Sequence, residues 1–441
     1  MEISAGDTAW VLVSAALVLL MTPGLAFFYG GMVRAKSVLN MMMMSFVAIG
    51  IVTVLWVLYG YSLTFGDGGS GFIGDLSSIG IGELVDQLAT NGGTYPIPAL
   101  AFAMFQLMFA IITVALISGA IADRAKFLAW CIFVGVWVTV VYFPVAHWVF
   151  DFGSDELGGS GAGWLANRGV LDFAGGTAVH INAGAAGLAL VLVLGKRVAW
   201  PKTPMKPHNL PLVLLGSGLL WFGWFGFNAG SALGANQTAA VAFANTMVAT
   251  AAALLGWLAV ERVRDGHATS LGGASGAVAG LVAITPACAF VAPWAAVVIG
   301  LLAGILCALA VGLKYRLGYD DSLDVVGVHL VGGLVGSLAI GFFATTEGNT
   351  FGKDGLLYGG GWGVLGTQAL GAFSVLAYSF VVTLLIGFII HKLIGFRVDK
   401  DAEIEGIDLD QHLESAYDLT ATVGGVLGPR TAKASHTEVN A

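Results

Sequence analysis

Apolar runs separated by short polar interruptions recur along the whole chain of 441 residues. Each run has about twenty residues, enough for a helix to cross roughly 30 Å of hydrocarbon. We expect these spans near residues 8–30, 39–64, 97–121, 127–150, 171–194, 209–232, 237–260, 271–290, 293–313, 325–345 and 367–396. The pattern therefore predicts an all-α integral membrane protein with eleven transmembrane helices.

The composition agrees with a protein that has the bilayer as its solvent. Hydrophobic residues make up 57% of the chain, charged residues 10%, and the mean hydropathy is +0.86. A soluble domain is about 25% charged. The net charge of -8 resides in loops and the C-terminal region, and no segment is basic enough to predict a nucleic-acid partner. The three cysteines fall inside apolar runs, so we expect buried thiols and no disulfide framework.

The distribution of lysine and arginine predicts the orientation of these spans, because cytoplasmic loops favour both residues. With the N-terminus outside and the C-terminus inside, the outside loops hold only Arg168 and Lys353. The inside loops then hold Arg34, Lys36, Arg124, Lys126, Lys196, Arg197, Lys202, Lys206, Arg262, Arg264, Lys314 and Arg316. The first ten residues contain no lysine or arginine, so the first run is expected to be a retained helix in the cell membrane, not a signal peptide.

Five spans precede residue 200 and five more end near 345, so the second five begin from the opposite side of the membrane. This arithmetic predicts a five-plus-five inverted repeat, 8–194 and 209–345, with its substrate site near the midplane at the repeat interface. Together with the helix 367–396 it forms a transmembrane domain, residues 1–396. Residues 397–441 form a polar cytoplasmic tail.

One histidine lies inside an apolar span of each predicted half, His180 after Asp172 and His329 after Asp324. A histidine inside a membrane span is unfavourable in free energy, so it indicates a functional site by default. A metal site needs three or four ligands, and a catalytic site needs a nucleophile, a base and an orienting group. Neither set is present, so we expect no metal, no cofactor and no enzyme activity. The pair is suited to lining an apolar path with neutral imidazoles that hydrogen-bond a small polar solute.

The two aspartates lie about 12 Å and about 8 Å along their helices from His180 and His329 respectively. If both histidines are near the midplane, at least one aspartate is recessed from the membrane face. Helix N-capping suits both Asp172 and Asp324. Asp172 has a second possible role, a fixed negative charge that favours a cation just outside the pore. The acidic outside loops, 65–96 and 151–170, are either solvated connectors or a mild attraction for cations.

Four motifs resemble the ammonium transporter family that also includes the Rh proteins, and the resemblance to its prokaryotic Amt type covers nearly the whole chain. The most specific motif is Asp172-Phe-Ala-Gly-Gly-Thr-Ala-Val-His180-Ile-Asn-Ala-Gly. The others are Thr22-Pro-Gly-Leu-Ala-Phe-Phe-Tyr-Gly-Gly31, Trp224-Phe-Gly-Phe-Asn-Ala-Gly-Ser231 and Val326-Gly-Val-His329. The resemblance implies a homotrimer with one pore through each subunit, and transport of ammonium or ammonia.

The same resemblance implies an outer site that holds ammonium on aromatic faces and a hydroxyl group. By motif, these positions are Phe105, Phe109 and Ser231, with Phe109 and Phe227 stacked as a gate above the twin histidines. Ammonium would be recruited by cation–π attraction, lose a proton and pass through the apolar pore. Many members have a tryptophan at one further position, where this chain has Phe150.

Trp148 is the alternative to Phe150 at that position, although it should project from a different face of its helix. The segment 405–417 resembles the tail of the family, and a PII-type signalling protein is a possible partner at the cytoplasmic face. Three functions stay open: an ammonium transporter or channel, a carbon dioxide channel, and an ammonium sensor. The sequence does not decide whether transport carries net charge.

Overall fold

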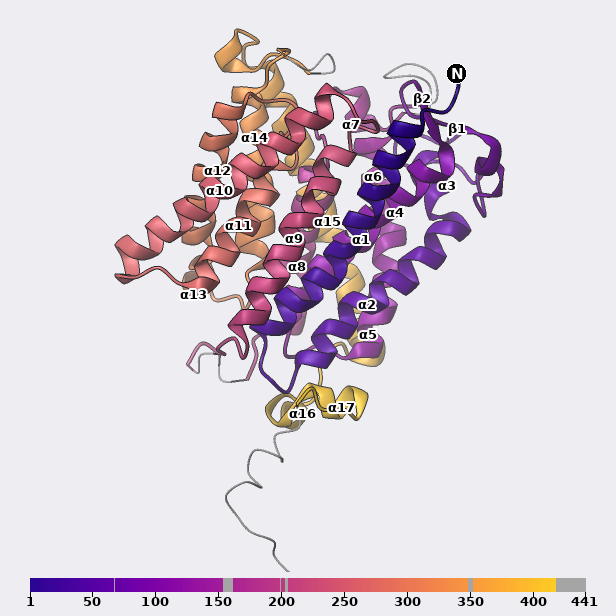
Figure 1. The fold of residues 1–441 in the computed structure, drawn as a ribbon. Coiled ribbons are helices and arrows are strands. Elements are labelled where there is room, and N and C mark those ends of the chain that lie inside the picture. The colour runs from indigo at the N-terminus through magenta and orange to yellow at the C-terminus, as the bar shows by residue number, and fades with distance from the viewer. Residues whose placement is uncertain (67, 154–161, 199, 203–204, 348–351, 418–441) are drawn as a thin grey trace, which may run out of the picture.

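The computed structural model describes residues 1–66, 68–153, 162–198, 200–202, 205–347 and 352–417, which form a bundle of long helices (Figure 1). The long elements are α1 (Ala5–Met32), α2 (Val38–Leu55) with η1 (Trp56–Gly60) and α3 (Tyr61–Phe65), α4 (Ala99–Ile117) with η3 (Ser118–Ile121), α5 (Phe127–Trp137) with η4 (Val138–Tyr142) and α6 (Phe143–Phe150), η5 (Gly176–Ile181) with α8 (Asn182–Leu194), α9 (Leu210–Gly230), α10 (Gln237–Asp265), α11 (Ser270–Ile284), α12 (Pro293–Ala310) with α13 (Leu313–Leu317), η6 (Val326–Leu330) with α14 (Val331–Phe343), and α15 (Gly363–Ile394).

Short elements lie at the two ends of the bundle. They are η2 (Gly82–Asp86), the antiparallel hairpin β1 (Leu88–Thr90) and β2 (Thr94–Pro98), α7 (Trp164–Asn167), η7 (Leu356–Tyr358), α16 (Lys400–Glu405) and α17 (Ile407–His412). The hairpin was not predicted from the hydrophobic pattern. It is short, but its strand β2 carries Tyr95, which lines the cavity described below.

Within the described residues, ten helical segments are long and apolar enough to cross a membrane. The predicted membrane class is confirmed, and the protein is a multi-pass membrane protein. The helix α11 is apolar but shorter, with 15 residues, and it occupies most of the predicted span 271–290. The observed boundaries lie within several residues of the predicted ones.

Polar residues between the apolar runs begin the helices that follow. The side chains of Asn209, Asn236 and Thr269 accept hydrogen bonds from the backbone of the first turns of α9, α10 and α11. Such caps satisfy N–H groups that have no partner inside a helix. These three apolar runs therefore start as helices where their polar interruptions end.

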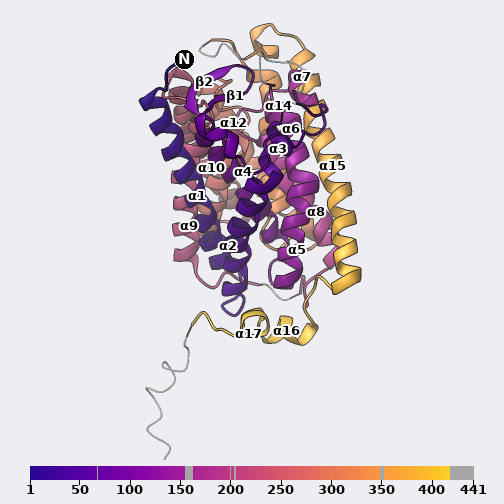
Figure 2. The same cartoon turned by 90° about the vertical axis from the view of Figure 1, so that its right-hand side faces the viewer.

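The N-terminus and the helices α16 and α17 lie at opposite ends of the bundle (Figures 1 and 2). We call these the N-terminal end and the tail end. Figure 2 shows α15 along one side of the bundle and α1 beside α9 along the other. This arrangement leaves η5–α8 and η6–α14, which carry the two histidines, in the interior.

Two glycines bring these interior helices into backbone contact. Gly184 follows His180 by one helical turn, and a methyl group at Gly184 would lie 2.5 Å from the backbone nitrogen of Leu330. Gly333 follows His329 by one turn, and a methyl group there would lie 3.1 Å from the backbone nitrogen of Ile181. Small residues allow such close approach between membrane helices. The contact is reciprocal, so each histidine lies close to the other helix.

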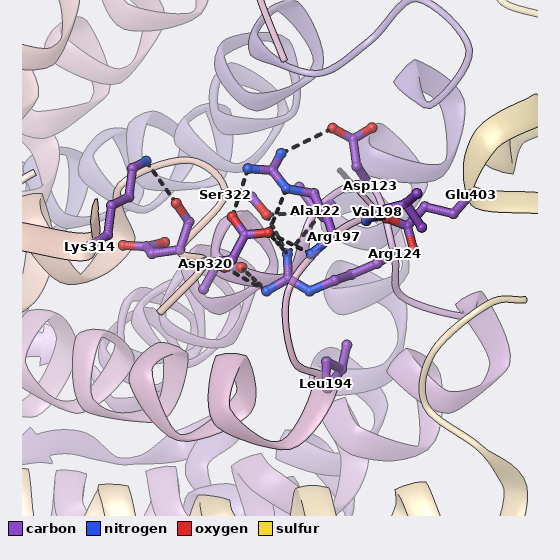
Figure 3. Close-up of polar contacts among 12 residues, drawn as sticks. Ala122, Asp123, Arg124, Leu194, Arg197, Val198, Lys314, Asp320, Ser322 and Glu403 are labelled. Atoms are coloured by element: carbon purple, nitrogen blue, oxygen red, sulfur yellow. Dashed lines mark hydrogen bonds and ion pairs between the residues drawn. The ribbon is translucent and has the colours of Figure 1, made fainter. Parts of the chain in front are cut away.

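A buried network of arginines and aspartates ties together the loops at the tail end (Figure 3). Arg124 donates to the carbonyl of Asp320 at 2.6 Å, and Arg197 pairs with the carboxylate of Asp320 at 2.9 Å. Arg197 also lies 3.5 Å from Asp123. Burial opposes ionisation of Asp320, but the hydrogen bond and the charge of Arg197 outweigh it and lower the pKa of this carboxyl group below its ordinary value.

The tail packs on this network and on the start of α2. Glu403 accepts hydrogen bonds from the backbone of Val198 at 2.5 Å and from Arg397 at 2.6 Å. The carboxylate of Asp408 accepts from the backbone nitrogens of Leu39 at 3.0 Å and Asn40 at 2.8 Å, which places a negative charge at the N-terminus of α2. The described part of the tail, up to residue 417, is therefore bound to the bundle.

Candidate functional site

A cavity of about 520 Å³ opens at the N-terminal end of the bundle. Four of the predicted site residues line it, namely Phe109, Phe150, Asp172 and Ser231. Sequence reasoning missed several further lining residues, including Tyr95, Phe102, Gln106 and Phe290. Phe102 and Gln106 lie close to Phe109 on α4, and helical spacing could have identified them once Phe109 was chosen.

Phenylalanine rings close the bottom of this cavity. The rings of Phe109 and Phe227 have centroids 4.2 Å apart and planes inclined by 33°. Phe227 is fully buried and is not among the lining residues, so its ring stacks on Phe109 away from the cavity. Phe105 is also fully buried, 5.0 Å from Phe109, and does not line the cavity. Phe105 therefore supports the ring of Phe109 and does not present its own face to the cavity.

Ser231 has a hydroxyl group whose proton is already donated in a hydrogen bond. Its Oγ donates to the carbonyl oxygen of Phe227 at 2.8 Å. The lone pairs of the oxygen stay available, so the hydroxyl can accept a hydrogen bond from a donor in the cavity. A cationic N–H donor is the kind of group that this position and the nearby aromatic ring both suit.

Of the two aromatic candidates on α6, Phe150 lines the cavity and Trp148 does not. The Phe150 ring lies 6.4 Å from that of Phe109, and its carbonyl accepts a hydrogen bond from Asn91 at 2.9 Å. The Trp148 nitrogen donates to the carbonyl of Phe72, and its ring packs 4.7 Å from that of Tyr378. The two side chains thus project from different faces of α6, as their spacing predicts.

His147, also on α6, joins this helix to the loop after α3. Its Nδ1 lies 2.9 Å from the carbonyl oxygen of Thr64 and 3.1 Å from the carboxylate of Asp151, and its Nε2 lies 2.9 Å from the carbonyl oxygen of Ser70. Each of these partners is an acceptor. A neutral imidazole would turn a lone pair toward one of them, so the geometry fits an imidazolium ion paired with Asp151. Sequence reasoning did not identify this residue.

Asp172 begins the helix that carries His180. Its two carboxylate oxygens accept hydrogen bonds from the backbone nitrogens of Gly175, Gly176, Thr177 and Ala178, at 2.9, 2.7, 2.8 and 3.1 Å. Gly175 has a positive φ of 114°, a conformation that suits glycine and lets the chain fold back over the carboxylate. Asp172 is therefore an N-cap that also lines the cavity.

The prediction that Asp324 caps the second histidine helix, as Asp172 caps the first, is wrong. Asp324 has a positive φ of 65°, and its carboxylate accepts a hydrogen bond from Lys314 at 2.6 Å. Asp321 instead caps the second helix, because its carboxylate accepts from the backbone nitrogens of Val325 and Val326 at 3.1 and 2.7 Å. Asp321 precedes His329 by the same eight positions that separate Asp172 from His180. The equal spacing of eight positions could have identified Asp321 from the sequence, but the nearer Asp324 was chosen instead.

The two histidines meet in the interior of the bundle. His180 belongs to η5 and His329 to η6. Both residues are buried, with 1% and 3% of their surface exposed respectively. Their Nδ1 atoms are 3.3 Å apart and their ring centroids 5.4 Å apart. The ring of His180 stacks 5.4 Å from Trp224 and 6.2 Å from Phe227, which places the pair directly behind the stacked rings of Phe109 and Phe227.

The contact between the two Nδ1 atoms restricts the protonation of both rings. In a neutral pair, one Nδ1 carries the proton and the other accepts it. The two Nε2 atoms must then differ, one an acceptor and the other a donor. Nε2 of His180 has no hydrogen-bond partner among the described residues. Protonating both rings would bring two N–H groups and two positive charges together, which this geometry disfavours.

A metal is not indicated at this site. Among the described residues, no group of three or more histidine, cysteine, aspartate or glutamate side chains could hold one. The site therefore offers aromatic faces, one hydroxyl, one capped carboxylate and an imidazole pair. These groups can bind and pass a small hydrogen-bonding solute.

Comparison with known proteins identifies the family. Residues 9–417 match the Ammonium Transporter Family. An ammonium transporter of Mycobacterium tuberculosis is 59% identical over 444 residues, covering 96% of this chain and 93% of that protein. The crystal structure of Candida albicans Mep2 is similar with a TM-score of 0.83 and 34% identity, over 95% of this chain and 94% of Mep2. A structure described as a sensor Amt protein also has a TM-score of 0.83, at 30% identity over 92% of this chain and 98% of that protein.

A bundle of membrane-spanning helices with a buried polar pair behind an aromatic constriction defines a membrane transporter or channel, not an enzyme. The match over 9–417 and the identity of 59% specify which one. The chain belongs to the ammonium transporter family.

Proposed function

We propose that this protein carries ammonium across the cell membrane by recruiting the ion at an outer aromatic site, removing a proton and passing ammonia through an apolar pore. The contact between His180 and His329, behind the stacked rings of Phe109 and Phe227, is the observation that carries the proposal. It offers one hydrogen-bond donor and one acceptor to a solute in otherwise apolar surroundings. Ammonia can use both.

The outer cavity is suited to the charged form of the substrate. The face of Phe109 and the acceptor lone pairs of Ser231 border the same space. A desolvated cation gains about 2 kcal/mol over an aromatic face. The capped carboxylate of Asp172 adds a negative charge to the lining of this cavity. Potassium would gain the charge attraction but could donate no hydrogen bond to Ser231.

The interior is suited to the neutral form. A bare cation in apolar surroundings is very unfavourable, whereas ammonia loses little by leaving water. The ion must therefore transfer one N–H proton to a base before ammonia passes the gate. The released proton either returns to the outer solution or follows through the imidazole pair. Current measured on a reconstituted membrane under an ammonium gradient distinguishes these two routes.

We further propose eleven spans in a five-plus-five inverted repeat, with the N-terminus outside and the tail inside. The reciprocal contacts of Gly184 and Gly333 and the matched caps at Asp172 and Asp321 support the repeat. The placement of the N-terminus and α16–α17 at opposite ends supports an odd number of crossings. In this topology, α11 crosses as a short span inside the bundle.

The resemblance to the family supports a homotrimer with a pore in each subunit, and the bound tail provides a cytoplasmic face where a PII-type protein could act. A sensor role is the second candidate, because one similar structure is described as a sensor Amt protein. A carbon dioxide channel is less well supported, since a neutral, apolar solute would use neither the hydroxyl of Ser231 nor the cation–π face of Phe109.

The outer site is tested by replacing Phe109 and Ser231 together with alanine in cells that lack their own ammonium uptake. The concentration of labelled methylammonium for half-maximal uptake should rise by about tenfold or more, since about 2 kcal/mol of binding is removed. The maximal rate should fall less. Phe222→Ala is the control, because it removes a phenylalanine ring that does not line the cavity and is 58% exposed. An unchanged concentration dependence in the double variant would refute the site.

A further inference from the structure

Two cationic side chains, Arg168 and Lys353, line the same cavity that is proposed to receive ammonium. They come from different loops, one after α7 and the other before η7. They are also the only two basic residues that the proposed topology places in outside loops. Their position at the mouth of the cavity was not anticipated from the sequence.

The two cations lie next to one another in the chain fold. Arg168 extends over the ring of Trp164, with its guanidinium carbon 5.0 Å from the ring centroid. Gly169 follows directly with a positive φ of 73°, and the Lys353 Nζ occupies the space that a side chain at position 169 would need. Both side chains are exposed. The mouth thus has two exposed positive charges close together, and Asp354, which follows Lys353, directs its carboxylate to Thr346.

Negative charge does not balance them among the described lining residues. Asp172 is the single carboxylate in that set, and its oxygens already accept four backbone hydrogen bonds. Asp151 is paired with His147. Glu83 and Asp86 lie on η2 and do not line the cavity. The described carboxylates of the acidic outside loops, Asp75, Glu83, Asp86 and Asp151, do not line the cavity, and Asp67, Asp155 and Glu156 lie outside the described residues.

We propose that Arg168 and Lys353 form an electropositive rim that weakens the binding of ammonium and makes it depend on ionic strength. This inference rests on the proposed function. It adds that the charge at the mouth of the cavity affects the binding of ammonium. Every monovalent cation meets the same repulsion at the rim, and only one that can use the aromatic face and the hydroxyl of Ser231 recovers binding free energy beyond it. The rim therefore does not attract ammonium, and the binding free energy comes from the aromatic site.

The rim predicts an unusual dependence on salt. Charges in water interact over about 10 Å at 0.1 M salt and over about 30 Å at 0.01 M. Raising the ionic strength should therefore screen the rim and lower the ammonium concentration for half-maximal transport. An acidic entrance would give the opposite slope. A change that acted only on folding would alter the rate without reversing this slope.

The test uses the full-length protein in vesicles of neutral phosphatidylcholine, where lipid charge cannot mimic the effect. Ammonium transport is measured at about 0.01 M and about 0.2 M sodium chloride. At the lower salt concentration, Lys353→Gln should lower the half-saturating concentration about twofold and Lys353→Glu about fourfold, as expected for one or two unit charges about 10 Å away in water. The maximal rate should stay within about twofold of wild type, because no group at the gate changes.

Three controls define the outcome. Lys353→Arg keeps the charge and should behave like wild type, and Arg168→Gln should act in the same direction as Lys353→Gln. Glu83→Lys adds a positive charge on the same end of the molecule, away from the cavity, and should change little. In Lys353→Glu the salt dependence should vanish or reverse. If all variants transported ammonium with the wild-type half-saturation and salt slope, the rim would be refuted while the proposed function stood. If wild-type vesicles carried no ammonium, the rim and the proposed function would both be refuted.

Discussion

At the scale of single residues, the histidine pair is where chemistry and geometry agree most closely. Nδ1 of His180 faces Nδ1 of His329 at 3.3 Å, so a neutral pair must hold one donor and one acceptor toward the pore. Trp224 and Phe227 stack beside His180 and exclude water from that side. Two adjacent buried imidazoles disfavour double protonation, and in the proposed pore a bare cation would find no negative partner beside them.

A carboxylate in place of either imidazole should change this selectivity. In His180→Asp and His329→Asp, a negative charge in the pore would compensate a bare cation. We therefore expect both variants to pass potassium, whereas His180→Ala and His329→Ala should impair ammonium transport without that leak. Growth and potassium flux in cells that lack their own potassium and ammonium uptake measure the difference. Full ammonium transport with no potassium flux in both aspartate variants would show that the pair does not control selectivity.

The sequence predicted the individual site residues unevenly. His180, His329 and Asp172 could be found because an ionisable group inside an apolar run is conspicuous. Asp321 was missed because Asp324 lies closer to His329, and only backbone geometry shows which carboxylate caps the helix. The rim was missed because Arg168 and Lys353 are 185 positions apart in the sequence and meet only through loop folding.

At the scale of secondary-structure elements, hydropathy predicted the spans well because length and apolar character are summed over many residues. It could not predict the π-helical segments η5 and η6, in which the histidines lie. A π-helical turn adds a residue without altering composition, and such turns occur often at functional sites. The hairpin β1–β2 escaped prediction because its strands have three and five residues.

The contact between η5–α8 and η6–α14 should not tolerate a larger residue. In Gly184→Ala, the added methyl group would lie 2.5 Å from the backbone nitrogen of Leu330, so the two helices must separate. We expect a loss of stability of about 1–3 kcal/mol and a maximal transport rate reduced by several fold. Gly218→Ala is the control, because a methyl group at Gly218 on α9 meets nothing within 4 Å. Equal transport by both variants would show that the histidines do not depend on this close approach.

The network at the tail end predicts a dependence of stability on pH. The lowered pKa of Asp320 means that its pairing with Arg197 stabilises the fold above the ordinary value of 3.8 and that this contribution is lost as the pH falls below that value. Asp320→Asn should therefore destabilise the protein by about 3–5 kcal/mol at neutral pH, since buried Arg197 loses its closest carboxylate and keeps only Asp123 at 3.5 Å.

Thermal unfolding of the purified protein in detergent, followed from about pH 7 to about pH 3, measures this contribution. The difference between wild type and Asp320→Asn should be largest at neutral pH and should narrow as Asp320 of the wild type becomes protonated. A difference that stayed constant over this range would contradict an ionised Asp320 as the source of the stability.

At the scale of the whole molecule, the account depends on the orientation of the bundle. The cavity opens at the N-terminal end and the tail packs at the other, so the proposed recruitment of ammonium and any binding of a partner to the tail would occur on opposite sides of the membrane. Basic residues of the predicted inside loops lie at the tail end: Arg34 and Lys36 donate to backbone carbonyls of the tail, and Arg124 and Arg197 join the network of Figure 3.

A protease added to sealed, right-side-out cells should leave the segment after Phe396 intact and should remove it after lysis. The reason is that an N-terminus outside and an odd number of spans place the tail inside. An epitope added at the C-terminus and detected by immunoblotting gives the measurement. Removal of the epitope from unlysed cells would overturn the eleven-span topology and the orientation together.

The central claim, that this protein carries ammonium through the histidine pair and excludes other cations, is tested most directly by flux into vesicles containing the purified protein. Labelled methylammonium and labelled rubidium, as a tracer for potassium, are offered together to wild type and to the double variant His180→Ala/His329→Ala. The account predicts saturable methylammonium uptake without rubidium uptake in the wild type, and methylammonium uptake reduced at least about tenfold in the double variant, as expected when about 1.4 kcal/mol or more of stabilisation in the pore is lost. Rubidium uptake equal to that of methylammonium in the wild type, or undiminished methylammonium uptake in the double variant, would contradict it.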